Sequence, residues 1–355
     1  MFVERPVVDQ VLACAFEVGA SDVHFDPHEG TWRVLIRLYG VLFPANRICD
    51  ALSAYVSKEA ILRLKVLAKL NIGEQRIPQD GQVTFHFSET QSCDLRINCL
   101  PTLYGERVVV RLLDGSKAIE NLTALGMREE EQQKIRHVMH DHKGLIIVAG
   151  SIGSGKSTTM HTMLLEQCRQ GASVLSLEDP IERKFPDFTQ VQIDEKQGMT
   201  FAQGLRAALR QDPDTLMVGE IRDGETADIA VRAGMIGHLI ISSIHANRPE
   251  GVMNRLLDFG VHPLCLEESL RLVIFQTLDP QFCQQCLGIG CDACHGIGYV
   301  ERKAAFQVMT HSEVSTQLLT TTASFSSQYV KEGAGSFALR KHAKSKMAYR
   351  FYPRS

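Results

Sequence analysis

The chain has 355 residues, enough for two ordinary domains, with 44% hydrophobic and 22% charged residues. Such a composition is that of globular proteins and excludes disorder over most of the length. A formal net charge of −3 gives no general preference for nucleic acid or an acidic surface. Because no stretch approaches the roughly 20 apolar residues of a membrane span, and the N-terminus lacks a signal-peptide pattern, we expect a cytoplasmic protein.

Residues 1–118 have the pattern of a small α+β domain. Apolar residues recur at helical spacing over 1–20 and again over 51–70. Short strand-like runs lie at 32–38, 82–87, 94–98 and 107–113. A linker is predicted over 114–125, followed by a connecting helix over 129–142.

From residue 144 onward, short apolar runs alternate with helical segments. The apolar runs are typical of strands buried on both faces and lie at 145–149, 173–177, 215–218 and 238–243. The helical segments between them lie at 156–169, 201–210 and 225–233. Alternation of this kind predicts an α/β domain with a parallel sheet over 119–280. Residues 304–355 lose this order and are predicted to be a separate C-terminal segment.

A phosphate-binding loop, G-x-x-x-x-G-K-[S/T], lies between a predicted strand and a predicted helix. Its glycines let backbone amides turn toward phosphates, and the helix N-terminus adds a positive dipole end. A chance glycine-rich turn would lack this context. We therefore expect ATP, with Lys156 reaching the β- and γ-phosphates and the Ser157 hydroxyl on Mg²⁺. The predicted nucleotide-binding residues are Gly150, Ser151, Ile152, Gly153, Ser154, Gly155, Lys156, Ser157 and Thr158.

Two predicted strands end in carboxylates, Glu178 and Glu220. In P-loop enzymes one such carboxylate lies near Mg²⁺ and another orients the attacking water. Each alone could equally be a solvated charge, but the nearby phosphate-binding loop favours catalysis. His238 and His245 flank the apolar run 239–244. They are either ordinary loop histidines or groups near the γ-phosphate.

Four of the ten cysteines, Cys283, Cys286, Cys291 and Cys294, form a tandem C-x-x-C-x-G-x-G repeat within 281–303. Two C-x-x-C pairs supply the four thiolates of a closed structural zinc site; four free thiols are the alternative. Most of the remaining cysteines lie in apolar surroundings and are predicted to be small core residues.

Several further motifs make the chain resemble the ATPases of type II secretion, type IV pilus assembly and competence pseudopili, from about residue 20 to residue 308. In the N-terminal unit the matching segments are Ala-Ser-Asp-Val-His (20–24), Arg-Ile-Pro-Gln-Asp-Gly (76–81), Asp-Leu-Arg-Ile-Asn (94–98) and Gly-Glu-Arg-Val-Val-Val-Arg (105–111). In the C-terminal unit they are Glu-Asp-Pro-Ile-Glu (178–182), Gly-Glu-Ile-Arg-Asp (219–223) and the histidine-containing stretch 237–245. The resemblance implies a RecA-like P-loop ATPase domain preceded by a smaller, PAS-like α+β domain.

The resemblance also implies catalytic roles. Glu178 becomes the water-orienting carboxylate and Glu220 the carboxylate near Mg²⁺, although the two could be exchanged. Arg96, Arg107 and Arg111 become candidates for contacting the nucleotide, in this subunit or from a neighbour. Ion pairs on the face of a sheet are the alternative for these arginines.

By the same resemblance we expect a homohexamer that lies at the cytoplasmic face of the plasma membrane. It would move a polytopic inner-membrane platform protein and thereby drive pseudopilin assembly. A compact cysteine repeat, and the start of the chain close to the first family motif, favour a competence-type pseudopilus for DNA uptake. The alternatives are a type II secretion or type IV pilus assembly ATPase, a DNA-handling P-loop ATPase and a non-hydrolysing scaffold. A C-terminal basic tail over 340–354 could contact lipid or nucleic acid, or simply be solvated.

Overall fold

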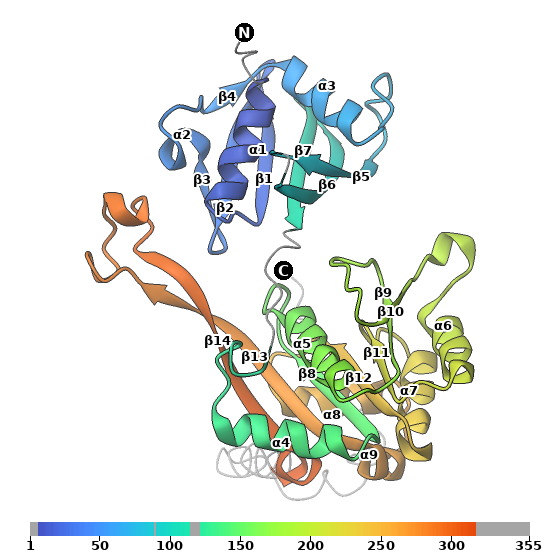
Figure 1. Ribbon diagram of the computed structural model, residues 1–355. Coiled ribbons are helices and arrows are strands. Elements are labelled where there is room, and N and C mark those ends of the chain that lie inside the picture. Colours follow the sequence, from blue (N-terminus) through green and yellow to red (C-terminus); the bar gives the residue numbers. More distant parts are fainter. Residues whose placement is uncertain (1–5, 89, 114–120, 317–355) are drawn as a thin grey trace, which may run out of the picture.

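The computed structural model describes residues 6–88, 90–113 and 121–316, and the basic tail predicted at 340–354 lies outside them. The described residues form two sheets, each with its own helices (Figure 1). Within these ranges, no helix combines the length and the apolar character needed to cross a bilayer.

The N-terminal sheet is entirely antiparallel and has the strand order β3-β2-β1-β7-β6-β5, with the short β4 paired to β2. Its elements are α1 (Val7–Glu17), β1 (Asp22–His28), β2 (Thr31–Leu38), β3 (Val41–Pro44), α2 (Ala45–Ile48), β4 (Tyr55–Val56), α3 (Lys58–Leu67), β5 (Gln79–His86), β6 (Ser92–Thr102) and β7 (Gly105–Leu113). The helix predicted over 51–70 begins only at Lys58, because the preceding residues pair with β2 as β4.

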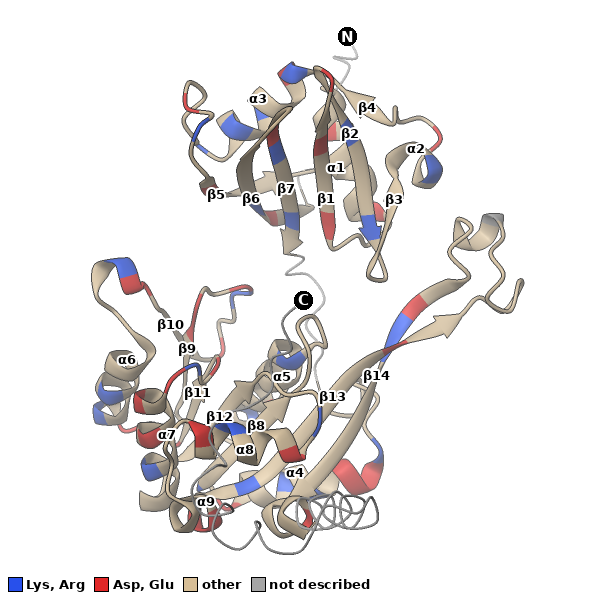
Figure 2. Ribbon diagram, turned by 180° about the vertical axis from the view of Figure 1, so that it is seen from behind, with Lys and Arg blue, Asp and Glu red and all other residues tan. Residues whose placement is uncertain are grey.

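Alternate residues of each N-terminal strand point to opposite faces of the sheet. One face carries apolar side chains such as Phe25 and Leu95, which are fully buried in a core shared with α1 and α3. The other face carries charged residues, so that acidic β1 lies beside basic β7 (Figure 2). Cys14 of α1 and Cys49, which follows α2, are joined by a disulfide, where the sequence analysis predicted small core residues.

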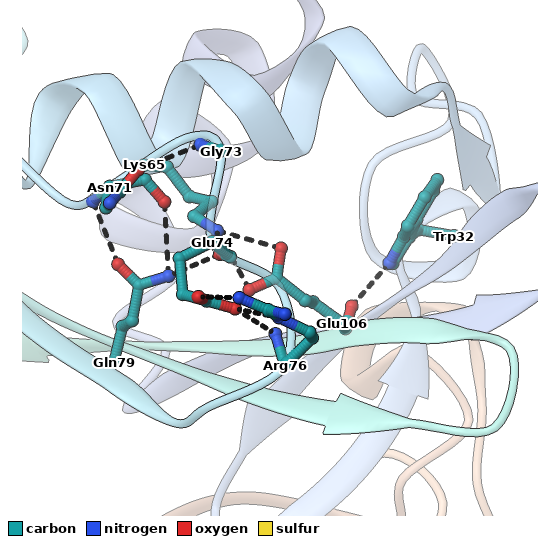
Figure 3. Close-up of polar contacts among 8 residues, drawn as sticks. All are labelled: Trp32, Lys65, Asn71, Gly73, Glu74, Arg76, Gln79 and Glu106. Atoms are coloured by element: carbon teal, nitrogen blue, oxygen red, sulfur yellow. Dashed lines mark hydrogen bonds and ion pairs between the residues drawn. The ribbon is translucent and has the colours of Figure 1, made fainter.

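A buried ion pair holds the loop between α3 and β5 (Figure 3). Both oxygens of the Glu106 carboxylate lie 2.9 Å from Lys65 Nζ, and these side chains are 5% and 0% exposed. Lys65 Nζ also donates to the Glu74 carbonyl at 2.7 Å. Trp32 Nε1 donates to the Glu106 carbonyl at 2.7 Å, which ties β2 to the start of β7. The loop that carries Arg76 is thereby fixed to the sheet.

The second sheet has the order β10-β9-β11-β12-β8-β13-β14, with all pairs parallel except β13 with β14. Its elements are α4 (Glu129–His140), β8 (Gly144–Ala149), α5 (Lys156–Arg169), β9 (Val174–Glu178), β10 (Thr189–Gln192), η1 (Glu195–Gln197), α6 (Phe201–Ala208), η2 (Leu209–Gln211), β11 (Thr215–Val218), α7 (Gly224–Ile236), β12 (Leu239–Ile244), α8 (Glu250–Asp258), α9 (Pro263–Ser269), β13 (Leu270–Phe282), η3 (Asp292–Cys294) and β14 (Tyr299–Thr310). The parallel α/β prediction is confirmed.

Helices cover both faces of this sheet, which explains why its central strands are apolar throughout. All six residues of β8 are buried. Ile146 and Val148 face a core with α4 and α5, while Leu145 and Ile147 face a second core with α6 and α7. The carboxyl ends of the parallel strands consequently meet at one edge, where a ligand site is expected in such folds.

The cysteine repeat lies at the tip of the hairpin formed by β13 and β14. These strands run continuously through residues 280 and 303, the predicted limits of the neighbouring segments, and β14 continues to Thr310. Ile297, within the repeat, packs against the N-terminal core. The hairpin therefore links the α/β sheet to the N-terminal sheet.

Candidate functional site

The phosphate-binding loop connects β8 to α5 and passes close to β13. Gly155 has φ +88°, and a Cβ there would lie 2.9 Å from Gln276 Nε2. Gly150 likewise leaves no room for a Cβ beside the Gln276 carbonyl. The buried Ser154 hydroxyl has no hydrogen-bond partner among the described residues. A loop of turned amides with an unpaired buried hydroxyl fits a phosphate group.

The loop lysine lies inside the site. Lys156 Nζ donates to the carbonyls of Gly150 and Ser151, both at 3.0 Å, and lies 3.4 Å from His245 Nδ1. Burial lowers the pKa of Lys156. His245 Nε2 in turn lies 3.3 Å from the Glu220 carboxylate. His245 therefore bridges the phosphate-binding lysine and the carboxylate that follows β11.

Burial, followed by the charge of Lys156, lowers the pKa of His245, so we expect a neutral imidazole at pH 7. Arg222 forms an ion pair with Glu220 and a second one, at 2.9 Å, with Asp179 after β9. These contacts join the ends of adjacent strands β9 and β11. Arg222 thus joins the acidic ends of β9 and β11, and His245 joins Glu220 to the lysine of the P-loop.

Glu178 is more enclosed than its predicted role as a strand-end charge suggests. It is 5% exposed, and its carboxylate has three protein hydrogen-bond partners, one each from α5, β9 and β10. Burial acts to raise the pKa of Glu178, but these hydrogen bonds and the charge interaction with His161 together outweigh burial and lower it. The carboxylate is therefore ionised at neutral pH.

His238 is not brought to this edge. It precedes β12, so it lies at the opposite end of the strand from His245, and its Nδ1 lies 3.0 Å from the Pro213 carbonyl before β11. Parallel strands put their amino ends together at the far edge of the sheet. Within this chain, His238 is a residue of that edge, as the ordinary-histidine alternative predicts.

Two of the three candidate arginines line a cavity of about 610 Å³. Arg96 and Arg111 are directly opposite each other on β6 and β7 and share this cavity with Asp179 and Lys196 of the second unit. Arg111 also forms an ion pair with Asp22 at 3.0 Å. The cavity connects the charged face of the N-terminal sheet to the acidic strand end.

Arg107 lies on the same face of β7 as Val109, which lines this cavity, but its side chain contacts residues of β1. Its Nε donates to Asp26 at 2.7 Å, and its Nη2 lies 3.1 Å from His24 Nδ1. It does not line the cavity that contains Arg96 and Arg111. These contacts correspond to the sheet-face ion pairs considered as the alternative.

Gln276 of β13 is a site residue that the sequence analysis did not select. Its Oε1 accepts a 2.7 Å hydrogen bond from Thr159 of α5, and its side chain is 2% exposed. Together with its contacts to the loop glycines, this bond attaches β13 to the phosphate-binding loop. In the sequence, Gln276 begins a Gln-Thr-Leu triplet (276–278) that carries no chemistry by itself, so no local signal marks it.

The four clustered cysteines have the geometry of a tetrahedral metal site. Their sulfur atoms lie within 4.8 Å of one another, with Cys283–Cys291 at 3.9 Å, Cys286–Cys294 at 3.7 Å and Cys291–Cys294 at 3.8 Å. A tetrahedron with Zn–S bonds of about 2.3 Å has sulfur–sulfur edges of about 3.8 Å. The residues present therefore fit zinc.

Backbone amides complete the thiolate environment. The Cys291 and Gly298 N–H groups each donate to Cys294 Sγ at 3.2 Å, and the Gly290 N–H donates to Cys286 Sγ at 3.2 Å. The hydrogen bond from the Cys291 backbone N–H is the largest cause that lowers the pKa of Cys294 to about 6. Such donors favour thiolates, the form in which cysteine binds metal.

Comparison with known proteins identifies related sequences. A putative type II secretion system protein E of Escherichia coli K12 is 38% identical over 328 residues, covering 85% of this chain and 66% of that protein. The type IV pilus assembly ATPase PilB of Pseudomonas aeruginosa is 40% identical over 279 residues, covering 79% and 49%. A type II secretion system protein E of Pectobacterium carotovorum is 41% identical over 280 residues, covering 79% and 55%. The chain thus spans about half to two-thirds of these relatives.

Solved structures share the fold. The Legionella pneumophila ATPase DotB superposes with a TM-score of 0.68 at 20% identity, covering 87% of this chain and 82% of DotB. The pilus retraction motor PilT with bound ADP gives 0.58 at 22% identity, covering 95% and 97%. Residues 1–352 match the model of the protein family described as "Type II/IV secretion system protein". The chain therefore belongs to the family of type II/IV secretion system proteins.

Proposed function

We propose that this chain is an ATP-hydrolysing motor for a machine of the type II secretion or type IV pilus class. The observation that carries the proposal is the series of contacts from Lys156 through His245 to Glu220, at the sheet edge where Glu178 also ends a strand. Phosphoryl transfer needs this kind of positioning and charge stabilisation. The relative named as a type IV pilus assembly ATPase supports the same activity.

Each residue has a defined part in the proposal. Lys156 and the loop amides bind the β- and γ-phosphates. Ser157 and Glu220 would hold Mg²⁺, which would supply positive charge to neutralise the phosphates. Glu178 orients the attacking water, and His245 holds the side chains of Lys156 and Glu220 in position through its two ring nitrogens. Because Glu178 is buried and hydrogen-bonded whereas Glu220 faces the loop lysine through His245, we favour this division over the exchanged one.

We further propose that Arg96 and Arg111, which belong to the N-terminal unit, stabilise the charge that develops on the transferred phosphoryl group. We propose that this unit is a PAS-like domain.

The motor would act as a homohexamer on a polytopic membrane platform protein. The machine that this motor drives would be a competence-type pseudopilus for DNA uptake, and the compact cysteine repeat supports this choice. Transformation, protein secretion and pilus formation in a deletion strain distinguish the three systems.

The activity is tested by phosphate release from ATP, measured together with oligomer size. We expect Lys156→Ala to reduce kcat by at least about 100-fold, because the lysine contacts the transferred phosphoryl group. Lys143→Ala changes an exposed lysine just before β8 and serves as the matched control. Wild-type turnover of Lys156→Ala would overturn the proposal. Stimulation by DNA would favour the DNA-handling alternative, and binding without turnover would favour the scaffold.

A further inference from the structure

A histidine of the P-loop helix contacts the proposed water-orienting carboxylate. His161 Nε2 lies 3.1 Å from Glu178 Oε2, and both side chains are buried, with exposures of 7% and 6%. His161 belongs to α5, five positions after Lys156 and one and a half helical turns further along the helix. The helix that binds phosphate therefore also reaches the acidic strand end directly.

The remaining donors occupy the other carboxylate oxygen. Ser176 Oγ and Gln190 Nε2 donate to Glu178 Oε1 at 2.6 and 2.9 Å. An ionised carboxylate has about four lone-pair positions and accepts only. Among the described residues, donors take three positions, two of them on Oε1. The fourth position, left by these donors, lies on Oε2 beside the His161 bond.

Because Glu178 can only accept, His161 Nε2 must carry a proton in this contact. The imidazole is also held by aromatic packing. Its ring centre lies 4.8 Å from that of Phe185 and 6.3 Å from that of Phe188, and the two phenylalanine rings stack at 5.1 Å. His161 is thus a fixed donor on a buried carboxylate oxygen.

We propose that His161 is a positioning residue, which turns Glu178 so that the free lone pair of Oε2 is presented to the attacking water. The inference rests on the proposed function of Glu178 as the water-orienting group. It adds that the orientation of this group is set from the P-loop helix. An ordinary buried histidine would stabilise the fold but would act on turnover no more than other buried residues of α5.

Three substitutions separate these roles. His161→Leu removes the donor and keeps a similar volume. His161→Gln keeps an N–H donor at nearly the same reach, whereas His161→Asn keeps the amide but is one methylene shorter. Met163→Leu, at a fully buried and apolar α5 position of the same core, is the matched control. ATP affinity is measured by equilibrium binding alongside kcat and KM.

We expect His161→Leu and His161→Asn to lower kcat by about 10- to 100-fold, which is at or below the lower end of the roughly 10²- to 10⁴-fold contribution of an acid–base group, because Glu178 is displaced and not removed. KM and ATP affinity change less than about threefold, because the phosphate-binding contacts remain. His161→Gln recovers most of the activity. Equal kcat in the Gln and Leu variants, whether both high or both low, overturns the inference, since the donor would then not be the relevant property.

The double variant His161→Leu/Glu178→Gln makes the test specific. If His161 acts through Glu178, the double variant is no slower than Glu178→Gln alone. Multiplicative losses would mean an independent role for His161 and would overturn the inference. Wild-type kcat in Glu178→Gln would instead overturn the proposed role of Glu178 itself. Loss in Glu178→Gln with full activity in His161→Leu would remove only the present inference.

Discussion

Arg96 and Arg111 face each other across β6 and β7, and both line the cavity that reaches Asp179. In a single chain the paired arginines thus already lie beside the strand end that carries Glu178. Arginine suits developing phosphoryl charge because its planar fork donates two parallel hydrogen bonds. We therefore propose that these two residues act together, on the site of their own subunit.

We therefore expect Arg96→Ala and Arg111→Ala each to lower kcat by about 10³-fold, at the low end of the range for arginines that contact the transferred group. Phosphate release is the measurement, and Arg232→Ala, in an exposed helical ion pair with Asp228, is the control. Mixing Arg111→Ala subunits with Lys156→Ala subunits tests the direction. Action within one subunit leaves every mixture inactive, whereas recovered turnover would show action on a neighbour.

The buried Lys65–Glu106 pair gives a stability prediction. Lys65→Met leaves the Glu106 carboxylate buried without its cation, so we expect the free energy of unfolding to fall by about 3–5 kcal/mol. Adding Glu106→Leu removes the unpaired charge and should restore most of this loss. Urea denaturation followed by circular dichroism measures both.

Arg76→Ala is the matched control for this pair. The Arg76 side chain is 87% exposed and bonds only locally to Glu74 among the contacts drawn (Figure 3), so no measurable change in unfolding is expected. Equal destabilisation by Lys65→Met and by the double variant would contradict the ion-pair explanation, because the loss would then come from packing alone.

The cysteine cluster predicts about one zinc per chain after purification without chelators, measured by elemental analysis. Cys283→Ser should lower the stoichiometry well below one, since serine is a poor zinc ligand. Cys168→Ser, outside the cluster, should leave it at one. Metal-free protein from a chelator-free preparation would contradict the assignment.

The parts of the site that a local motif specifies could be predicted from sequence. Lys156, Glu220 and His245 follow strands whose apolar runs are unmistakable, and parallel strands bring their carboxyl ends to one edge. The same rule also explains why His238 is not at the site. His238 and His245 lie at opposite ends of the six-residue strand β12, and a strand of this length spans about 20 Å at roughly 3.3 Å per residue.

Residues placed by tertiary structure could not be predicted in this way. His161 reads as one polar position in an amphipathic helix, and only the packing of α5 against β9 brings it to Glu178. The central strand β1 was not predicted, because its outward residues are charged and Pro27 interrupts the pattern. Cys14 and Cys49 are joined by a disulfide although they lie 35 residues apart in the sequence, and no local pattern marks such a pair.

The outer face of the N-terminal sheet predicts a pH dependence of stability. Burial, then the charges of Arg37 and Arg107, lower the pKa of His24, against smaller opposing effects of Asp22 and Asp26. In the unfolded chain the histidine titrates near pH 6.5. As the pH falls through this value, the unfolded state takes up a proton that folded His24 does not. Stability is therefore lost below about pH 6.5, and His24 has no such effect above it.

His24→Gln removes the titrating group, so we expect the free energy of unfolding to decline less steeply between about pH 6.5 and pH 5 than in the parent protein. Urea denaturation at several pH values measures the slope. Gln82→Ala, at an exposed position of β5 in the same sheet, replaces a group that does not titrate; it is the control and should leave the slope unchanged. The slope is compared and not the stability itself, because the loss of the contact between Arg107 and His24 would lower the free energy of unfolding equally at every pH. An unaltered slope in His24→Gln would mean that the acid sensitivity arises elsewhere.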